Sequence, residues 1–294
     1  MTSSPARQEG AAPSRAKVLI VGATGHLGRY LGSALRASFD VVGTGWRRCG
    51  ADDISLDVTD SRAVAAVLER TAPDIIVLTA ACANVAFCEA NPQVSAAVNV
   101  AGTRHVVAHA GGCPVVFYSS DAVFDGTEPE YREDDSCHPL TVYGRQKQEA
   151  ESAVRTRSNA LILRTARFYT REGGDGKFID HVRSTLAQGQ AVTAPVDTPG
   201  NPTYLGDLTE ATRMLLVARQ SGTWHLAGPP VESLYQTARI VAEVCGFDPA
   251  LVRPVARDAN ARAPRICAVL NTDKARREGL RFRGLRDGLS LLGA

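Results

Sequence analysis

Three side chains near the middle of the sequence could together reduce a carbonyl group. Ser120 follows closely on an apolar run that ends at Tyr118, and Tyr143 and Lys147 stand four residues apart in a segment of helical pattern. Residues four apart share one face of a helix. A tyrosine can donate a proton to a carbonyl that accepts a hydride if a nearby ammonium stabilises its phenolate, and a serine can hold the carbonyl oxygen. These residue types predict a reductase in which Ser120, Tyr143 and Lys147 are catalytic.

Lys147 also stands out by its residue type. The chain has 33 basic residues, and only Lys17, Lys147, Lys177 and Lys274 are lysines. A solvated cation in this chain is therefore usually an arginine, and a lysine is expected where a compact ammonium is required. The alternative is an ordinary surface tyrosine and lysine on a helix.

A glycine-rich turn predicts a dinucleotide site. Gly22, Gly25 and Gly28 directly follow the apolar run 18–21 in the spacing G-x-x-G-x-x-G. Glycines between a buried strand and a helix allow a tight turn and bring backbone N–H groups close to a pyrophosphate. The spacing is not the commoner G-x-G-x-x-G, so the prediction depends on the position of the glycines directly after a strand.

The end of the second predicted strand, at residues 41–42, indicates which dinucleotide would bind. NAD sites usually carry an acidic residue there for the ribose 2′-hydroxyl, about 20 residues beyond the loop. Here Arg47 and Arg48 follow the strand, and their guanidiniums suit the 2′-phosphate of NADPH. The alternative is a solvated basic turn. Asp57 and Val58, after the third predicted strand, are expected to contact the adenine.

A parallel sheet is expected to position these residues. Apolar runs at 18–21, 41–42, 54–56, 75–78, 115–118 and 161–163 predict six strands, and helical patterns such as 63–70 and 94–109 lie between most of them. This alternation predicts an α/β fold with a doubly wound parallel sheet of the Rossmann type. After Arg164 the pattern loosens, which predicts a small C-terminal lobe that closes over the carboxyl ends of the strands.

The expected division of the chain has three parts. Residues 1–16 are small and polar and are expected to form a disordered tail, and residues 17–165 are expected to form the NADP-binding Rossmann domain. Residues 166–294 are expected to form mainly the substrate-binding lobe, with some segments returning to the Rossmann domain.

The composition is ordinary for a soluble globular protein, and the expected partner is a small-molecule substrate. Of the 294 residues 44% are hydrophobic and 22% are charged, the net charge is +2, and no basic run indicates a nucleic-acid partner. No apolar run approaches the ~20 residues that span a bilayer, and the N-terminal segment lacks the apolar stretch of a secretory signal, so a cytoplasmic protein without membrane contact is expected. The seven cysteines are scattered without C-x-x-C, which suggests neither a disulfide framework nor a metal site.

Taken together, the motifs resemble the extended short-chain dehydrogenase/reductases, and among them the dTDP-4-dehydrorhamnose reductases. The likeness covers nearly all of residues 17–292. Besides the glycine loop, the similar segments are Pro73-Asp-Ile-Ile-Val, Ala80-Ala81, Asn99 in Val-Asn-Val-Ala-Gly-Thr, Tyr118-Ser-Ser-Asp121, Phe124-Asp-Gly, Pro139-Leu-x-Val-Tyr-Gly, Tyr143-x-x-x-Lys147, Leu163-Arg-Thr, Gly200-Asn-Pro-Thr203 and Leu270-Asn-Thr-Asp-Lys274.

The resemblance implies NADPH-dependent reduction of a 4-keto group on a nucleotide-linked 6-deoxysugar, with a homodimer as one possible assembly. It implies that Ser120, Asp121 and Tyr143 lie by the substrate. The residues expected to lie by the cofactor are Gly22, Thr24, Gly25, His26, Leu27, Gly28, Arg47, Arg48, Asp57, Val58, Ala80, Ala81, Cys82, Asn99 and Tyr118.

Three departures from the family pattern fall on the substrate side. Ala122 stands where the family usually has an aromatic residue, Arg167 replaces a tryptophan, and residues 80–86 lack a hydroxyl and a carboxylate. A guanidinium in place of an aromatic face predicts a substrate that carries an anion near the ketone, bound by Arg167. The alternative is that Arg167 only pairs with a nearby acid.

Two other functions remain open at this point. The chain also resembles the regulatory β subunit of methionine adenosyltransferase, which implies a non-catalytic NADP-binding module. A nucleotide-sugar epimerase or dehydratase is the second possibility, and an epimerase would keep its nicotinamide bound and need no external reductant.

Overall fold

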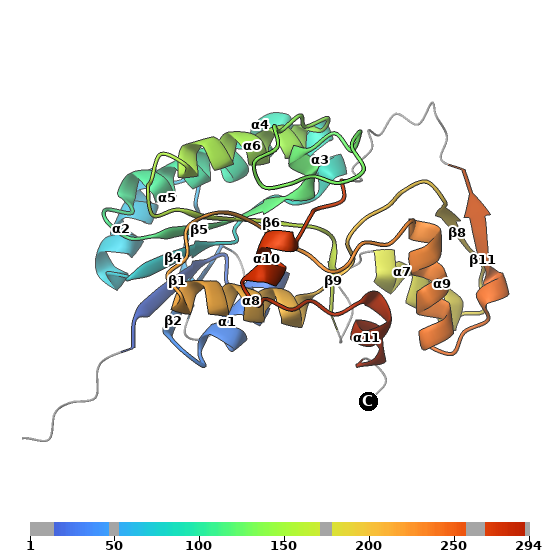
Figure 1. The fold of residues 1–294 in the computed structure, drawn as a ribbon. Coiled ribbons are helices and arrows are strands. Elements are labelled where there is room, and N and C mark those ends of the chain that lie inside the picture. Colours follow the sequence, from blue (N-terminus) through green and yellow to red (C-terminus); the bar gives the residue numbers. More distant parts are fainter. Residues whose placement is uncertain (1–14, 47–52, 171–177, 257–267, 292–294) are drawn as a thin grey trace, which may run out of the picture.

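A seven-stranded parallel sheet forms the centre of the protein in the computed structural model, which describes residues 15–46, 53–170, 178–256 and 268–291 (Figure 1). Arg47, Arg48 and most of the expected N-terminal tail lie outside these residues. The strands are β1 (Lys17–Val21), β2 (Asp40–Gly45), β3 (Ile54–Ser55), β4 (Ile75–Leu78), β5 (Val115–Ser120), β6 (Leu161–Thr165) and β10 (Gly222–Leu226).

The strand order is β10-β6-β5-β4-β1-β2-β3, and each neighbouring pair is parallel. The chain therefore builds outward from β1 in one direction and then from β4 in the other, which makes the gap between β1 and β4 the topological switch point. Val21 pairs with both Thr44 and Leu78, so the segments that follow these three strands leave the sheet at the same edge. This order confirms the predicted doubly wound α/β fold.

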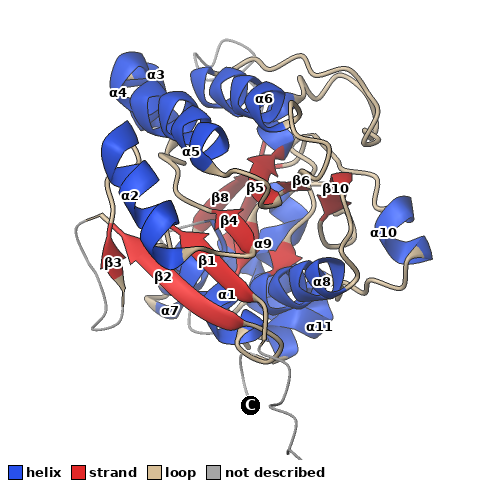
Figure 2. Ribbon diagram, turned by 90° about the vertical axis from the view of Figure 1, so that its left-hand side faces the viewer, coloured by secondary structure: helices blue, strands red, loops and turns tan. Residues whose placement is uncertain are grey.

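Helices cover both faces of the sheet because alternate strand residues are apolar on each side (Figure 2). On one face lie α1 (His26–Leu35) and α8 (Leu205–Val217), packed on each other and on β1, β6 and β10. On the other lie α2 (Ser61–Thr71), α5 (Thr103–His109) and α6 (Val142–Val154). Together the two layers bury most residues of β1, β4, β5, β6 and β10.

The six predicted strands and the helix at 63–70 are present, and two features differ from the prediction. The predicted helix 94–109 is divided into α4 (Pro92–Ala96), a π-helical turn (Ala97–Gly102) and α5, and α3 (Val85–Ala90) precedes it. The sheet also has a seventh strand, β10, which enters from the second half of the chain and pairs with β6. Together β10 and α8 are segments that return from the C-terminal part to the main sheet.

A smaller lobe lies beyond the carboxyl ends of the strands, at the right of Figure 1. Its core is formed by α7 (Phe178–Ala187), β8 (Val192–Pro195), α9 (Leu234–Val244), β11 (Val252–Val255) and α11 (Leu285–Ser290). At the junction, β7 (Phe168–Tyr169) pairs with β9 (Thr203–Tyr204), whereas α10 (Asp273–Arg277) packs beside β10. In the described parts of the chain, no helix is both long enough and apolar enough to cross a membrane.

Candidate active site

The glycine loop has a shape that side chains would prevent. Gly22 has φ +99°, and a Cβ there would lie 2.6 Å from the backbone N of Ala80. A Cβ on Gly28 would lie 2.2 Å from the carbonyl O of Gly22. Gly25 is the N-cap of α1 and adds no side chain over the first turn, so the helix presents its N-terminal N–H groups to the loop. These features fit a pyrophosphate held by backbone atoms.

A cavity of about 550 Å³ opens at the switch point, beside the glycine loop. It is lined by seven of the residues expected to contact the cofactor, namely Gly22, Thr24, Gly25, Asp57, Val58, Ala80 and Ala81. Both the backbone N and the hydroxyl of Thr59 donate hydrogen bonds to Oδ1 of Asp57, at 2.9 and 2.7 Å, which fixes the carboxylate at the rim. The cavity is therefore a mainly apolar site with the Asp57 carboxylate among its lining groups, and it is large enough for the adenosine half of a dinucleotide.

The other expected cofactor residues that the structure describes do not line this cavity. His26 stacks on Phe168 with ring centroids 6.0 Å apart and faces the lobe, and Leu27 packs against the sheet core. The side chain of Tyr118 points away, toward α8, where its hydroxyl shares a 2.6 Å hydrogen bond with Thr212. Tyr118 contributes to the site through its backbone instead, because its carbonyl O accepts a hydrogen bond from Lys147.

Asn99 lies in the π-helical turn and holds the loop that follows β4. Its Oδ1 accepts a hydrogen bond from the backbone N of Cys82 at 2.7 Å, and its Nδ2 donates to the carbonyl O of Cys82 at 3.0 Å. The same Nδ2 donates to Oε1 of Gln146 at 2.8 Å, and Gln146 donates onward to Ser95 and Pro92. Asn99 is 2% exposed, so it acts as a brace between this loop and α6.

Lys147 and Tyr143 project from α6 toward the carboxyl end of β5. The ammonium of Lys147 donates a 2.7 Å hydrogen bond to the carbonyl O of Tyr118 and lies 5.9 Å from the centroid of the Tyr143 ring. Burial lowers the pKa of Lys147 to about 8, because water no longer solvates the charge. Burial also raises the pKa of Tyr143, and the nearby Asp121 carboxylate adds to that rise, so the phenol stays protonated at neutral pH.

Ser120 and its neighbours hold α6 close to the end of β5. The Ser120 hydroxyl donates to Oδ1 of Asp121 at 2.8 Å and accepts from the backbone N of Ala122 at 3.1 Å. A Cβ on Gly144 would lie 2.1 Å from the carbonyl O of Ala122, so only glycine allows this approach of α6. The arrangement brings together the three predicted catalytic residues, Ser120, Tyr143 and Lys147.

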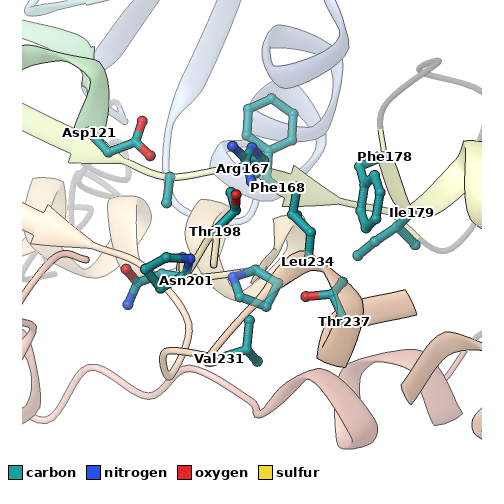
Figure 3. Close-up of a pocket in the computed structure, with 14 residues that line it drawn as sticks. Asp121, Arg167, Phe168, Phe178, Ile179, Thr198, Asn201, Val231, Leu234 and Thr237 are labelled. Carbon is teal, nitrogen blue, oxygen red and sulfur yellow. The ribbon is translucent and has the colours of Figure 1, made fainter. Parts of the chain in front are cut away.

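A second cavity, of about 310 Å³, lies between the sheet edge and the lobe (Figure 3). In that view Asp121 stands at one side, Phe178 and Ile179 stand at the other, and Arg167 and Thr198 lie between them. Burial raises the pKa of Asp121, and the guanidinium of Arg167 opposes this rise without cancelling it. Most of the remaining wall is apolar, and among the described residues that line the cavity Arg167 is the one cationic group.

Some features of the site were not predicted. Ala122 is buried against Tyr143 and Cys88 rather than lining the lobe cavity. Gln146 was missed, although its place beside Lys147 on a helix with a buried face is a usable signal. Phe178 and Thr198, which line the lobe cavity, come from loosely patterned segments that gave no such signal, whereas Asn201 lies in the family-like segment Gly200-Asn-Pro-Thr203 and was not assigned a role.

Two named relatives are similar to this chain over most of its length. A dTDP-4-dehydrorhamnose reductase of Mycobacterium tuberculosis is 35% identical over 260 residues, which cover 85% of this chain and 81% of the relative. Methionine adenosyltransferase 2 subunit beta of Xenopus laevis is 30% identical over 268 residues, covering 86% of this chain and 79% of that one.

Solved structures agree on the fold. The structure of a hypothetical dTDP-4-dehydrorhamnose reductase from Sulfolobus tokodaii has 28% identity and a TM-score of 0.83, with 92% of this chain and 98% of that chain covered. The reductase of Bacillus anthracis in complex with NADP has 24% identity and a TM-score of 0.84, with 95% and 99% covered. The family described as the RmlD substrate binding domain matches residues 16–292, and the chain belongs to this family.

Proposed function

We propose that this protein is an NADPH-dependent ketoreductase that reduces a keto group of a nucleotide-linked deoxysugar, or of a related polar ketone that carries an anion. The observation that supports this most is the convergence of Ser120, Tyr143 and Lys147 at the carboxyl end of β5, one strand away from the switch point. The relatives named dTDP-4-dehydrorhamnose reductase support the same reaction class.

The residues around the switch point fit a dinucleotide. Gly22 and Gly28 leave a cradle that a Cβ would fill, and the N-terminus of α1 faces it. Asp57 and Val58 line the neighbouring cavity, where the carboxylate and the backbone would meet the adenine edge. When bound, NADPH supplies the hydride, and Arg47 and Arg48 would hold its 2′-phosphate.

Tyr143 would donate the proton to the carbonyl oxygen as it gains negative charge. Because burial and Asp121 keep the phenol protonated, it is in the correct state to act as an acid. The ammonium of Lys147 would stabilise the phenolate that remains, and its hydrogen bond to Tyr118 fixes its position. Ser120 would turn its hydroxyl from Asp121 to the carbonyl oxygen of the substrate.

Arg167 would select an anionic group next to the ketone. The guanidinium borders the apolar lobe cavity and already interacts with the buried Asp121. A carboxylate or phosphate of the substrate would form a bidentate, charge-assisted contact there. Arg167 is exposed in the structure. When the bound substrate covers the ion pair, we expect Arg167→Ala to raise the KM for such a substrate ~10-fold or more, since hydrogen bonds to charged groups contribute ~1.5–3 kcal/mol. If Arg167 pairs only at the surface, its removal should cost under about 1 kcal/mol.

The test is a panel of nucleotide-linked ketosugars, each with and without an anionic substituent, incubated with NADPH and followed by the loss of reduced-nicotinamide absorbance. Reduction of a charged ketosugar that depends on Arg167 supports the proposal. Efficient reduction of dTDP-4-dehydrorhamnose, unaffected by Arg167→Ala, would overturn the anionic part and leave the ordinary activity of the relatives.

Two results would favour the other functions. Tight NADPH binding without turnover of any ketone would favour a regulatory module like the methionine adenosyltransferase subunit, to which the chain is 30% identical. Conversion of a nucleotide sugar without added reductant would favour an epimerase or dehydratase. We also propose a cytoplasmic location. A homodimer is a further proposal, which the mass of the protein in solution would test.

A further inference from the structure

Two cysteines that form no motif in the sequence are neighbours in the structure. Cys82 lies in the loop after β4, and Cys88 lies about halfway along α3. Their Sγ atoms are 3.9 Å apart, and the thiol of Cys88 donates a hydrogen bond to the carbonyl O of Cys82 at 3.3 Å. Both are free, as are the other cysteines that the structure describes. A disulfide bond is ~2.05 Å long, so the two sulfur atoms would have to approach by only about 2 Å to form one.

The two thiols differ in their access to solvent. Cys82 is partly buried and is followed by the exposed Ala83 and Asn84, which makes it the accessible member of the pair. Cys88 is 0% exposed, and burial raises its pKa to about 11, so it stays a thiol at neutral pH. Because the thiolate is the form that attacks a disulfide, Cys82 is the residue that would react first and Cys88 the one that would react second.

The pair lies beside the proposed proton donor. Cys88 is buried against Tyr143, and Cys82 packs against the same small cluster. Glu89, the next residue of α3, accepts a hydrogen bond at 2.7 Å from the backbone N of Val142, which directly precedes Tyr143. A displacement of α3 toward the Cys82 loop would therefore reach the first turn of α6.

The other end of the pair is connected to α6 as well. The backbone of Cys82 is held by Asn99 through two hydrogen bonds, and Asn99 donates to Gln146, which precedes Lys147. A displacement of the Cys82 loop would therefore strain this brace. Closing the gap between the two sulfur atoms has to move α3, the loop or both, and each is connected to the helix that carries Tyr143 and Lys147.

We propose that Cys82 and Cys88 form a redox-modification site, at which a low-molecular-weight disulfide oxidises the pair to an intramolecular disulfide that slows ketone reduction. The Cys82 thiolate first attacks the small disulfide, which forms a mixed disulfide and releases one thiolate. The Cys88 thiol then loses its proton and attacks Sγ of Cys82, which releases the second thiolate. The pair gives up two electrons and two protons, and the small disulfide becomes two thiols.

The chemistry of the pair fits a reversible modification. The buried Cys88 thiol ionises rarely, but the two sulfur atoms are held together, and such proximity strongly accelerates a reaction within one molecule. Disulfides of cytosolic proteins are mostly transient and catalytic or redox-sensing, which suits a pair that is free in the ground state. Formation of the bond is independent of the proposed function, whereas its effect on turnover rests on that function.

The first experiment detects the bond itself. The tryptic peptide 71–104 contains Cys82 and Cys88 and no other cysteine. After incubation of the protein with oxidised glutathione and blocking of the remaining thiols with iodoacetamide, this peptide should be unblocked and lighter by two hydrogen atoms than the dithiol peptide. A peptide that keeps both thiols, or that retains glutathione, would overturn the inference.

The variant Cys88→Ala tests the order of attack. It lacks the second thiol, so its peptide should retain one glutathione on Cys82, because the mixed disulfide cannot be resolved. An unmodified Cys82 in this variant would contradict its role as the attacking thiol.

The second experiment measures kcat after the glutathione has been removed, with saturating NADPH and ketone. A displacement of ~1 Å at a reacting centre can cost ~10²-fold in rate, so kcat of the oxidised protein should fall ~10-fold or more, and dithiothreitol should restore it. The ratio of kcat in the oxidised and reduced forms is compared between variants, so that a change in basal turnover cancels. In Cys82→Ala this ratio should stay near one.

Cys113→Ala is the matched control, because Cys113 is also partly buried but its thiol donates to the carbonyl O of Pro73, far from the pair in the sequence. It should lose as much activity on oxidation as the unmodified protein. Loss of activity in Cys82→Ala, or protection in Cys113→Ala, would assign the effect to another cysteine and overturn the inference.

The inference and the proposed function fail in different ways. If the protein reduces a ketone but forms no disulfide, or forms one with kcat unchanged, only the inference fails. If it reduces no ketone, the proposed function fails together with the effect on turnover, and the mass of peptide 71–104 still decides whether the modification occurs.

Discussion

The rate of ketone reduction should fall as the pH rises through about 8, because Lys147 loses its charge there. Burial lowers the pKa of Lys147 to about 8 from the ordinary 10.5, while the carboxylate of Glu151 opposes this shift. The charged form stabilises the Tyr143 phenolate, and the neutral amine cannot. At pH 7 about 90% of the side chain is charged, and at pH 9 about 10% is, so kcat should fall about tenfold per unit well above the pKa.

The assay is the pH dependence of kcat with saturating NADPH and ketone, between about pH 6 and 10. Tyr143 does not interfere because burial keeps its pKa above this range. The matched variant is Lys147→Arg, whose guanidinium fits the position less well but keeps its charge throughout. Its activity should be lower and should lack the step near pH 8. The same step in Lys147→Arg, or a flat profile of the unmodified enzyme up to pH 10, would refute the assignment.

Three further predictions follow from the packing of the site. Tyr143→Phe should lower kcat by on the order of 10²–10⁴ with NADPH affinity retained, and unchanged turnover in a stopped-flow assay would exclude Tyr143 as the acid. Gly28→Ala should weaken NADPH binding in calorimetry and cost ~1–3 kcal/mol of stability, since its Cβ would lie 2.2 Å from the carbonyl O of Gly22. Gly32→Ala on the same helix is the control, because its Cβ would meet only ordinary van der Waals contacts and the change should be tolerated. Arg164→Met should lower the free energy of unfolding by ~3 kcal/mol in urea, because it removes two hydrogen bonds of 2.9 Å from the buried Glu151 carboxylate. This value is the lower end of the ~3–5 kcal/mol for a broken buried ion pair, because Arg155 still donates to Glu151 at 2.9 Å. Full recovery should require Glu151→Gln as well, and a single variant of normal stability would contradict the prediction.

The sequence predicted the parts of the molecule in which local pattern and position agree. Four of the six strands contain apolar runs that lie almost wholly buried in the sheet (18–21, 75–78, 115–118 and 161–163), whereas 41–42 and 54–56 are shorter and partly buried. The glycine loop follows the first run. Tyr143 and Lys147 share a helix face whatever the tertiary structure, so their proximity could be expected from their spacing alone. The family match over residues 16–292 agrees with these predictions.

The parts that were missed depend on contacts between distant segments. The strand β10 has the sequence GTWHL, which reads as weakly apolar, and its burial comes from pairing with β6 and packing of α8. Arg164 continues an apolar strand and is 1% exposed, because Glu151, the carbonyl O of Glu133 and the Cys137 sulfur accept hydrogen bonds from its guanidinium. Asn99 was expected to contact the cofactor, but its hydrogen bonds brace the Cys82 loop, and its contact with a cofactor remains a prediction.

The return of α8 and β10 to the main sheet has a consequence for synthesis on the ribosome. Leu205, Leu208 and Leu226 cover the same face as Val18 and Leu163, yet they are translated after the first part of the lobe. A nascent chain that has reached only residue 165 therefore lacks both the edge strand and one covering helix, and its apolar face meets water or a chaperone. The nucleotide-binding half should thus complete its fold late, after residue 226 has left the exit tunnel, and a stop codon at position 166 should yield an aggregating fragment rather than a working half-enzyme.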